Sequence, residues 1–140
     1  MPARIAADWE QALRLMSAMA TQDGAHYLHV LQPNQYVGDR VFSPRERRLA
    51  IHPRSSYALL APAGYPALKA AGAHLVASGI PYRDGIGIFD ATAEAVYADD
   101  CCHFNQRGND LLANFVFEAV AEIMRRDEAP TEGAGRNRTQ

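Results

Sequence analysis

The stretch of sequence that predicts the fold is Tyr97-Ala98-Asp99-Asp100-Cys101-Cys102-His103-Phe104-Asn105-Gln106-Arg107-Gly108. It places a carboxylate, Asp100, three residues before an imidazole, His103. In a tight loop Asp100 can accept a hydrogen bond from one ring nitrogen of His103, which fixes the tautomer and leaves the other nitrogen as a general base. Asn105 follows where its side-chain oxygen can cap the next predicted helix. We therefore expect a rigid element to hold the Asp–His pair.

This block resembles the C-terminal motif of the SGNH (GDSL-type) hydrolases, in which Asp-x-x-His supplies two members of a Ser-His-Asp triad. Asp100 and His103 match the motif residue by residue, and the spacing of Asn105 and Gly108 is also common in the family. The resemblance covers roughly residues 6–126 and implies a three-layer α/β/α, flavodoxin-like fold with a parallel sheet. It also implies a hydrolase acting on a small-molecule ester, with Asp100 and His103 catalytic and with neither metal nor cofactor.

The other blocks of that family have no counterpart in this sequence. An SGNH hydrolase carries its nucleophile in a Gly-Asp-Ser block, whereas Arg40 follows Gly38-Asp39 here. The Gly and Gly-x-Asn-Asp blocks that supply oxyanion donors are also missing, because Gly108-Asn109-Asp110 falls after the histidine, inside a predicted helix. We therefore expect residues 1–126 to be the C-terminal portion of such a domain and to be inactive alone. A catalytically inactive binding or interaction module of the same fold is the alternative.

Two other chemistries would use the same block. The five side chains from Asp99 to His103 are of the types that zinc prefers, but adjacent ligands strain a tetrahedral site and the sequence holds no second ligand cluster. A cysteine nucleophile with His103 as its base is disfavoured because Cys102 is covalently next to the histidine. The two cysteines are expected to be partly buried free thiols, since neighbouring Cα atoms about 3.8 Å apart lie below the usual disulfide window.

The composition is that of an ordinary globular chain, with 140 residues, 48% hydrophobic and 21% charged. A formal net charge of −2 gives no attraction to nucleic acid or to anionic membranes. No apolar run approaches the roughly 20 residues of a membrane span. The N-terminal segment is amphipathic and carries Asp8, Glu10 and Arg14, so it does not resemble a signal peptide. Localisation and oligomeric state are left open.

Hydrophobic periodicity predicts helices that alternate with strands. The helices are expected over residues 6–20, 63–78 and 105–126, the strands over 25–31 and 80–84, a short capped helix after Ser43-Pro44, and a disordered tail over 127–140. This alternation implies right-handed crossovers and a parallel sheet. Residues 32–36 follow the carboxyl end of the first strand, where they can either line a substrate cleft or simply form a turn. Residues 37–62 are expected to be irregular, as a segment that covers the active site.

Overall fold

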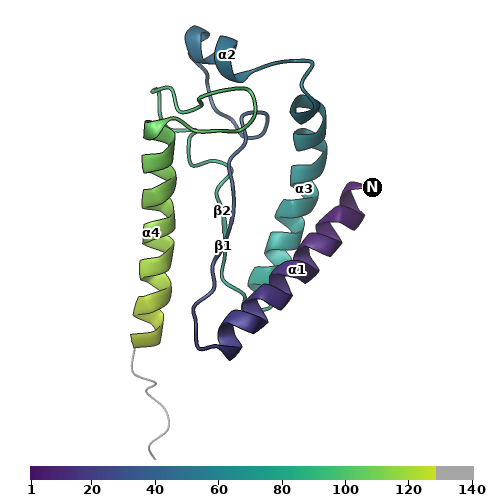
Figure 1. Cartoon of the computed structure of the whole chain (residues 1–140), viewed down its shortest axis with the longest axis vertical. Helices are drawn as coiled ribbons and strands as arrows, with labels where there is room; N and C mark the ends of the chain where they lie inside the picture. The colour runs from purple at the N-terminus through teal and green to yellow at the C-terminus, as the bar shows by residue number, and fades with distance from the viewer. Residues whose placement is uncertain (129–140) are drawn as a thin grey trace, which may run out of the picture.

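The computed structural model describes residues 1–128, with side chains through residue 126, and has a mixed α/β fold (Figure 1). Its elements in chain order are α1 (Pro2–Gln22), β1 (His29–Leu31), α2 (Pro44–Ala50), α3 (Ser56–Ala77), β2 (Tyr82–Asp84) and α4 (Gln106–Glu128). The predicted disordered tail lies outside the described residues, except that its first two residues end α4. Among residues 1–128, none of the helices combines the length and the apolar character that a membrane span requires.

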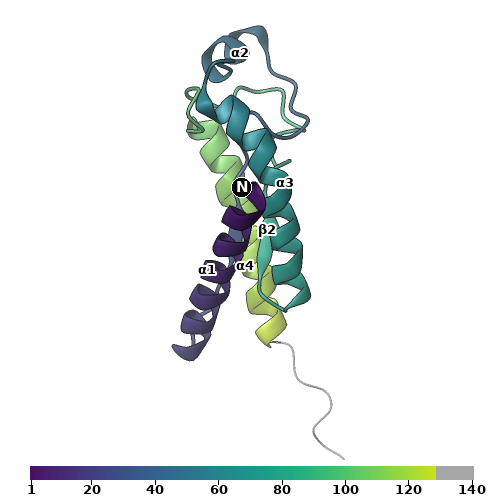
Figure 2. The same ribbon diagram turned by 90° about the vertical axis from the view of Figure 1, so that its right-hand side faces the viewer.

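The two strands form a parallel sheet, in which His29 pairs with Tyr82 and Leu31 pairs with Asp84. Helices α1 and α3 pack together on one side of this sheet, and α4 lies on the other side (Figure 1, Figure 2). The predicted parallel pairing is confirmed, although both strands are shorter than expected. The second strand begins only after Pro81, which has no N–H to give and contributes its carbonyl to the His29 N–H instead.

Helix α3 is longer than its hydrophobic pattern predicts. It begins at Ser56, with the Ser55 side chain as its N-cap, so the expectation of irregular chain through residue 62 is wrong for the last part of that segment. Pro62 and Pro66 both lie inside the helix, where each removes one N–H donor from the backbone ladder. Tertiary packing against α1 and the sheet overrides the local preference of these prolines.

The main hydrophobic core lies between the sheet and the pair α1 and α3. Its buried members are Leu13, Leu31, Leu75 and Tyr82. Gly72 of α3 lies against the ring of Tyr82, and a Cβ atom at this glycine would stand 2.2 Å from Tyr82 Cζ. The close approach of α3 to β2 therefore requires a residue without a side chain at this position.

A second core cluster lies at the carboxyl end of the sheet. Its buried members are Ala50, Phe89, Val96 and Tyr97, with Phe104 packed against them. The ring centroids of Phe89 and Tyr97 are 5.7 Å apart, and those of Phe89 and Phe104 are 5.1 Å apart, both in edge-to-face geometry. This cluster joins the segment after β1, the segment after β2 and the start of α4 into one support.

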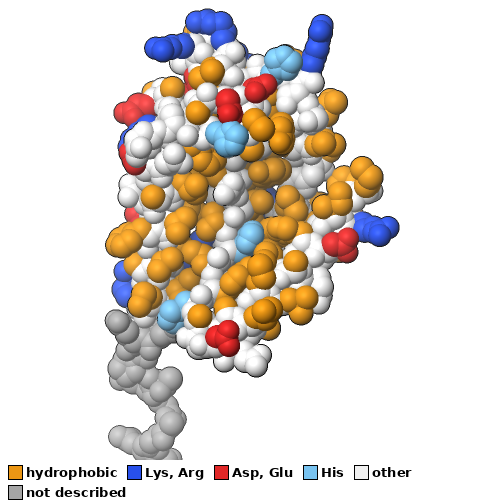
Figure 3. All heavy atoms as spheres, in the orientation of Figure 1, with side chains coloured by type: hydrophobic (Ala, Val, Ile, Leu, Met, Phe, Trp, Pro, Cys, Tyr) orange, Lys and Arg blue, Asp and Glu red, His pale blue; other side chains and the backbone are white. Residues whose placement is uncertain are grey.

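Hydrophobic side chains also gather on the surface, over the middle of the face shown in Figure 3. Apart from the terminal Met1, the most exposed large hydrophobic residues are Val41, Leu59 and Phe117, with 82%, 72% and 71% of their surface exposed. Within residues 1–128 the sheet has two strands, so each strand has one edge whose N–H and C=O groups lack a neighbouring strand. Strand edges of this kind can pair with further strands.

Candidate active site

The loop that carries the predicted pair is closed at its base by backbone hydrogen bonds. Tyr97 and Phe104 form an isolated antiparallel bridge, and the Ala98 N–H donates to the His103 carbonyl over 2.9 Å. The side chains of Tyr97 and Phe104 belong to the second core cluster, with ring centroids 5.6 Å apart. The core therefore holds both ends of the loop, and residues 98–103 are presented on a fixed base.

Asn105 caps α4, as the sequence predicts. Its Oδ1 accepts the Gly108 N–H over 3.0 Å, and its Nδ2 donates to the Ala95 carbonyl over 2.8 Å. Gly108 is needed because a Cβ atom there would lie 2.6 Å from the Val96 carbonyl oxygen and 2.9 Å from Phe104 Cβ. The spacing Asn105 to Gly108 thus combines a helix cap with a close approach of α4 to the segment before the loop.

His103 is paired with Asp99 and not with Asp100. His103 Nδ1 lies 2.6 Å from Asp99 Oδ2, and Asp99 Oδ1 accepts the backbone N–H groups of Cys101 and His103 over 2.8 and 3.3 Å. Asp100 is half-buried and makes no side-chain hydrogen bond or ion pair within the described residues. The expected contact of Asp100 with the ring is therefore wrong. The backbone of Cys102 has a φ of 73°, and the loop that includes this turn brings His103 back over Asp99.

The electrostatics of this pair favour one tautomer of the histidine. The hydrogen bond from His103 lowers the pKa of Asp99, and the backbone N–H groups lower it further, so Asp99 is an acceptor at neutral pH. Since an ionised carboxylate only accepts hydrogen bonds, the hydrogen of His103 lies on Nδ1. The side chains are 71% and 41% exposed for His103 and Asp99, so Nε2 can accept a proton from a group outside the loop.

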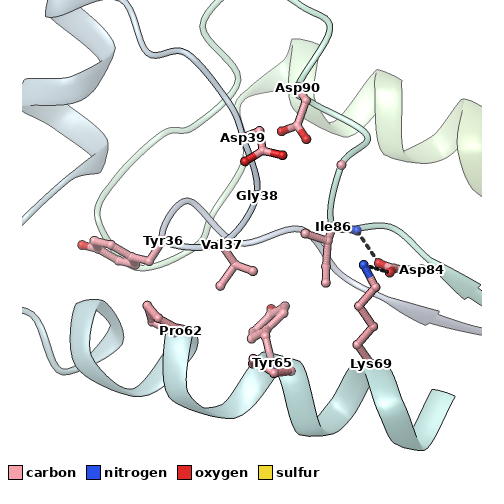
Figure 4. A pocket seen from close by; sticks show the side chains of 12 residues that line it. Tyr36, Val37, Gly38, Asp39, Pro62, Tyr65, Lys69, Asp84, Ile86 and Asp90 are labelled. Carbon is pink, nitrogen blue, oxygen red and sulfur yellow. Dashed lines mark hydrogen bonds and ion pairs between the residues drawn. The ribbon is translucent and has the colours of Figure 1, made fainter. Parts of the chain in front are cut away.

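A cavity of about 640 Å³ lies at the carboxyl ends of β1 and β2 (Figure 4). Its apolar wall comes from the segment after β1, from α3 and from the segment after β2, through Tyr36, Val37, Pro62, Tyr65, Pro66 and Ile86. At one side Lys69 Nζ forms an ion pair with Asp84 Oδ2 over 3.2 Å. Asp39 and Asp90 line the cavity farther from α3, as Figure 4 shows. Residues 32–36 were expected either to line a cleft or to form a turn, and Tyr36 lines the cavity.

The other polar residues of that segment hold its turn. Asn34 and Gln35 are both 6% exposed. Asn34 Oδ1 accepts the Tyr36 N–H over 3.0 Å, and Gln35 Nε2 donates to the Ala50 carbonyl over 3.4 Å. The Tyr65 hydroxyl reaches back to the Gln32 carbonyl over 3.1 Å, which ties α3 to the end of β1. Turn formation and cleft lining therefore fall to different residues of the same segment.

A buried ion pair supports the chain that leads into the loop, and the sequence gives no direct sign of it. Arg40 and Glu46 have side chains 4% and 0% exposed, with Arg40 Nη2 2.7 Å from Glu46 Oε2. Glu46 Oε1 accepts the N–H groups of Val96 and Tyr97 over 2.7 and 3.2 Å. The guanidinium also donates to three backbone carbonyls, at Phe89, Thr92 and Glu94. Arg40 is thus a structural residue.

Three serine hydroxyls of the described chain are engaged in helix caps or in a hydrogen bond to the backbone. Ser43 accepts the Glu46 N–H as the N-cap of α2, which confirms the predicted capped helix there. Ser55 caps α3, and Ser78 donates to the His74 carbonyl. Within residues 1–128 no serine forms a hydrogen bond with His103. In the same range no three His, Cys, Asp or Glu side chains are grouped to hold a metal ion, so the Asp99–His103 block does not form a metal cluster.

No family model matches this chain, and neither does any curated protein or solved structure.

Proposed function

We propose that this chain supplies the general base and its orienting carboxylate to a serine ester hydrolase of the SGNH type. His103 is the base and Asp99 is the carboxylate that orients it. The nucleophilic serine and the oxyanion donors come from polypeptide outside these residues. The observation that carries the proposal is the hydrogen bond of 2.6 Å between His103 Nδ1 and Asp99 Oδ2, in a loop whose two ends are fixed in a core.

The pair is suited to move one proton twice. His103 Nε2 takes the proton from a serine hydroxyl while that oxygen attacks the acyl carbon of the ester. The imidazolium formed is stabilised by the negative charge of Asp99. His103 then gives the proton to the departing alcohol oxygen, and a water molecule repeats the cycle to release the acid and the free serine. No step needs a change of oxidation state.

Two features outside the loop support the same function, and none of residues 98–103 lines the cavity that is one of them. The cavity beside the sheet lies at the carboxyl ends of parallel strands, where open α/β sheets bind their ligands. Its tyrosine and proline wall would hold the small-molecule ester substrate. The free strand edges are where additional strands would complete a three-layer, flavodoxin-like sheet that carries the serine.

The test uses the complete protein that contains this segment. We expect His103→Ala to reduce the turnover of a short-chain p-nitrophenyl ester by about 10⁴-fold, because the base is lost. Asp99→Asn should also lower turnover sharply, since an amide favours the wrong tautomer of the ring. Asp100→Asn is the matched control and should retain turnover within a few-fold. A large loss in Asp100→Asn with none in Asp99→Asn would assign the role to Asp100, as the family motif implies, and overturn the pairing seen here.

The isolated chain provides a second measurement. Residues 1–140 should not react with a fluorophosphonate probe for activated serines, because Ser43 and Ser55 serve as helix caps and no described serine forms a hydrogen bond with His103. Stoichiometric labelling that disappears in His103→Ala would refute the external nucleophile. A complete protein without ester turnover, but with the pair intact, would favour the inactive binding module.

A further inference from the structure

We propose that Cys101 and Cys102 form a reversible redox-modification site, at which a disulfide between the two neighbours displaces His103. In an extended segment, adjacent side chains point to opposite sides of the chain. Cys102 instead adopts the left-handed region, with a φ of 73°. Burial raises the pKa of the Cys102 thiol, and the neighbouring Cys101 thiol and Asp99 carboxylate raise it further.

Both thiols are available for reaction. They are free and half-buried, and Cys101 Sγ lies 3.4 Å from the Tyr57 hydroxyl at the start of α3. The Cys101 thiol donates a hydrogen bond to the Tyr57 hydroxyl, and the raised pKa of Cys102 disfavours the Cys102 thiolate. Cys101 is therefore the thiol that attacks first, and Cys102 is the thiol that resolves the product.

The reaction is an exchange with a low-molecular-weight disulfide such as glutathione disulfide. The Cys101 thiolate attacks one sulfur of the reagent and releases one glutathione thiolate, leaving a mixed disulfide on the protein. Cys102 then loses its proton and attacks Cys101 Sγ, which releases the second glutathione. In sum, the two protein thiols lose two electrons and two protons, and the reagent is reduced to two thiols.

The bond between neighbours is easily reversed. Disulfides usually join Cα atoms about 4.4–6.8 Å apart, and neighbouring residues are about 3.8 Å apart, so the ring stores strain and is readily reduced. Strained disulfides of this kind are labile or regulatory, in contrast to the bonds that stabilise secreted domains. The site is therefore suited to respond to a change in the ratio of glutathione disulfide to glutathione around the protein.

Oxidation would reach His103 through Asp99. The Asp99 carboxylate accepts hydrogen bonds from the Cys101 N–H, from the His103 N–H and from the His103 ring, so its partners include one of the two cysteines and the residue that follows them. Closing the ring changes the backbone torsions between these contacts, so they cannot all persist. The movement of His103 follows from the loop alone, and its effect on ester hydrolysis rests on the proposed function.

The first experiment follows the thiols and the histidine in the 140-residue chain, incubated at graded ratios of glutathione disulfide to glutathione. Trypsin releases both cysteines in one peptide, residues 84–107, because the next basic residue after Arg83 is Arg107. We expect this peptide to lose two hydrogens and both maleimide-reactive thiols, and to regain them with dithiothreitol. The imidazole cross-peaks of His103 in the NMR spectrum should shift with the same dependence on the glutathione ratio.

Variants of the two cysteines serve as controls. Cys101→Ser and Cys102→Ser should each stop at a mixed disulfide with glutathione, and the double variant to alanine should show His103 cross-peaks that do not respond to the ratio. Two stable mixed disulfides in the parent, or cross-links between chains, would overturn the proposal. So would a disulfide that leaves the His103 cross-peaks unmoved.

The complete protein separates this inference from the proposed function. Oxidation should lower ester turnover by about 10²-fold, as expected for a displaced catalytic group, and the double alanine variant should be insensitive. If the disulfide forms and His103 moves but the protein never hydrolyses esters, the proposed function fails alone. If turnover depends on His103 and no disulfide forms, the redox inference fails alone.

Discussion

Replacing Glu46 with glutamine tests whether the buried ion pair with Arg40 supports the candidate site. The side chain of Glu46 is fully buried, and its two oxygens have separate duties. Oε2 receives Arg40 Nη2, and Oε1 receives the N–H groups of Val96 and Tyr97. Glu46→Gln preserves the shape and one acceptor oxygen, so it removes the charge that faces Arg40 and leaves the two backbone bonds in place.

The expected cost follows from what remains around the guanidinium. Breaking a buried ion pair by removal of one partner costs about 3–5 kcal/mol. Arg40 keeps its hydrogen bonds to three backbone carbonyls, so the stranded charge is not isolated and the lower end applies, about 3 kcal/mol. With a urea slope of about 2 kcal/mol per molar, the denaturation midpoint should fall by about 1.5 M.

The measurement is urea denaturation of the 140-residue chain, followed by circular dichroism. Glu94→Gln is the matched control because Glu94 pairs with Arg107 at the surface, with the two side chains 64% and 45% exposed. An exposed pair of this kind contributes about 0–1 kcal/mol, so the control midpoint should fall by less than about 0.5 M. Equal midpoints for the two variants would refute the claim that the buried pair stabilises this end of the fold.

Three further predictions concern packing and titration. Gly72→Ala should destabilise the fold by about 1–3 kcal/mol in urea denaturation, because the new Cβ atom meets the buried ring of Tyr82. Gly64→Ala on the same helix is the control and should be neutral or stabilising, because the new Cβ atom meets nothing within 4 Å. Phe115→Ala should cost about 1–2 kcal/mol in the same assay, since the ring is half-buried. The pairing with His103 lowers the pKa of Asp99, so the stabilisation that the pair provides is complete at pH values above the ordinary pKa of aspartate and is lost as the pH falls through the lowered pKa. His103→Asn should raise the pKa of Asp99, which carboxyl-carbon NMR can follow.

Local chemistry made part of the site predictable. The cap by Asn105 and the start of α2 at Ser43-Pro44 depend on neighbours within one helical turn, and both were predicted correctly. The choice between Asp99 and Asp100 was not predictable in this way. It depends on the left-handed backbone of Cys102, and a cysteine with positive φ has no sequence signature comparable to glycine.

Long-range contacts account for what sequence reasoning missed. The run from Arg45 to Arg48 has the composition of a solvated helix face, yet Glu46 within it is buried against backbone groups 50 and 51 residues away. The early start of α3 was missed because Pro62 interrupts the helical pattern and the helix was predicted only from residue 63, although packing with α1 maintains the helix. Periodicity describes neighbours on one element, and these features are decided by which elements meet.

The two prolines inside α3 have a consequence for motion. Each removes a ladder bond, so the carbonyls one turn before them lack the N–H that would restrain them. The N-terminal half of α3 should open locally at a lower free energy than the half that contains Leu75, and its amides should exchange with deuterium sooner. Since Pro62, Tyr65 and Pro66 line the cavity, the first part of α3 to open is also a wall of that cavity. A molecule bound against this wall should slow exchange there more than anywhere else along the helix.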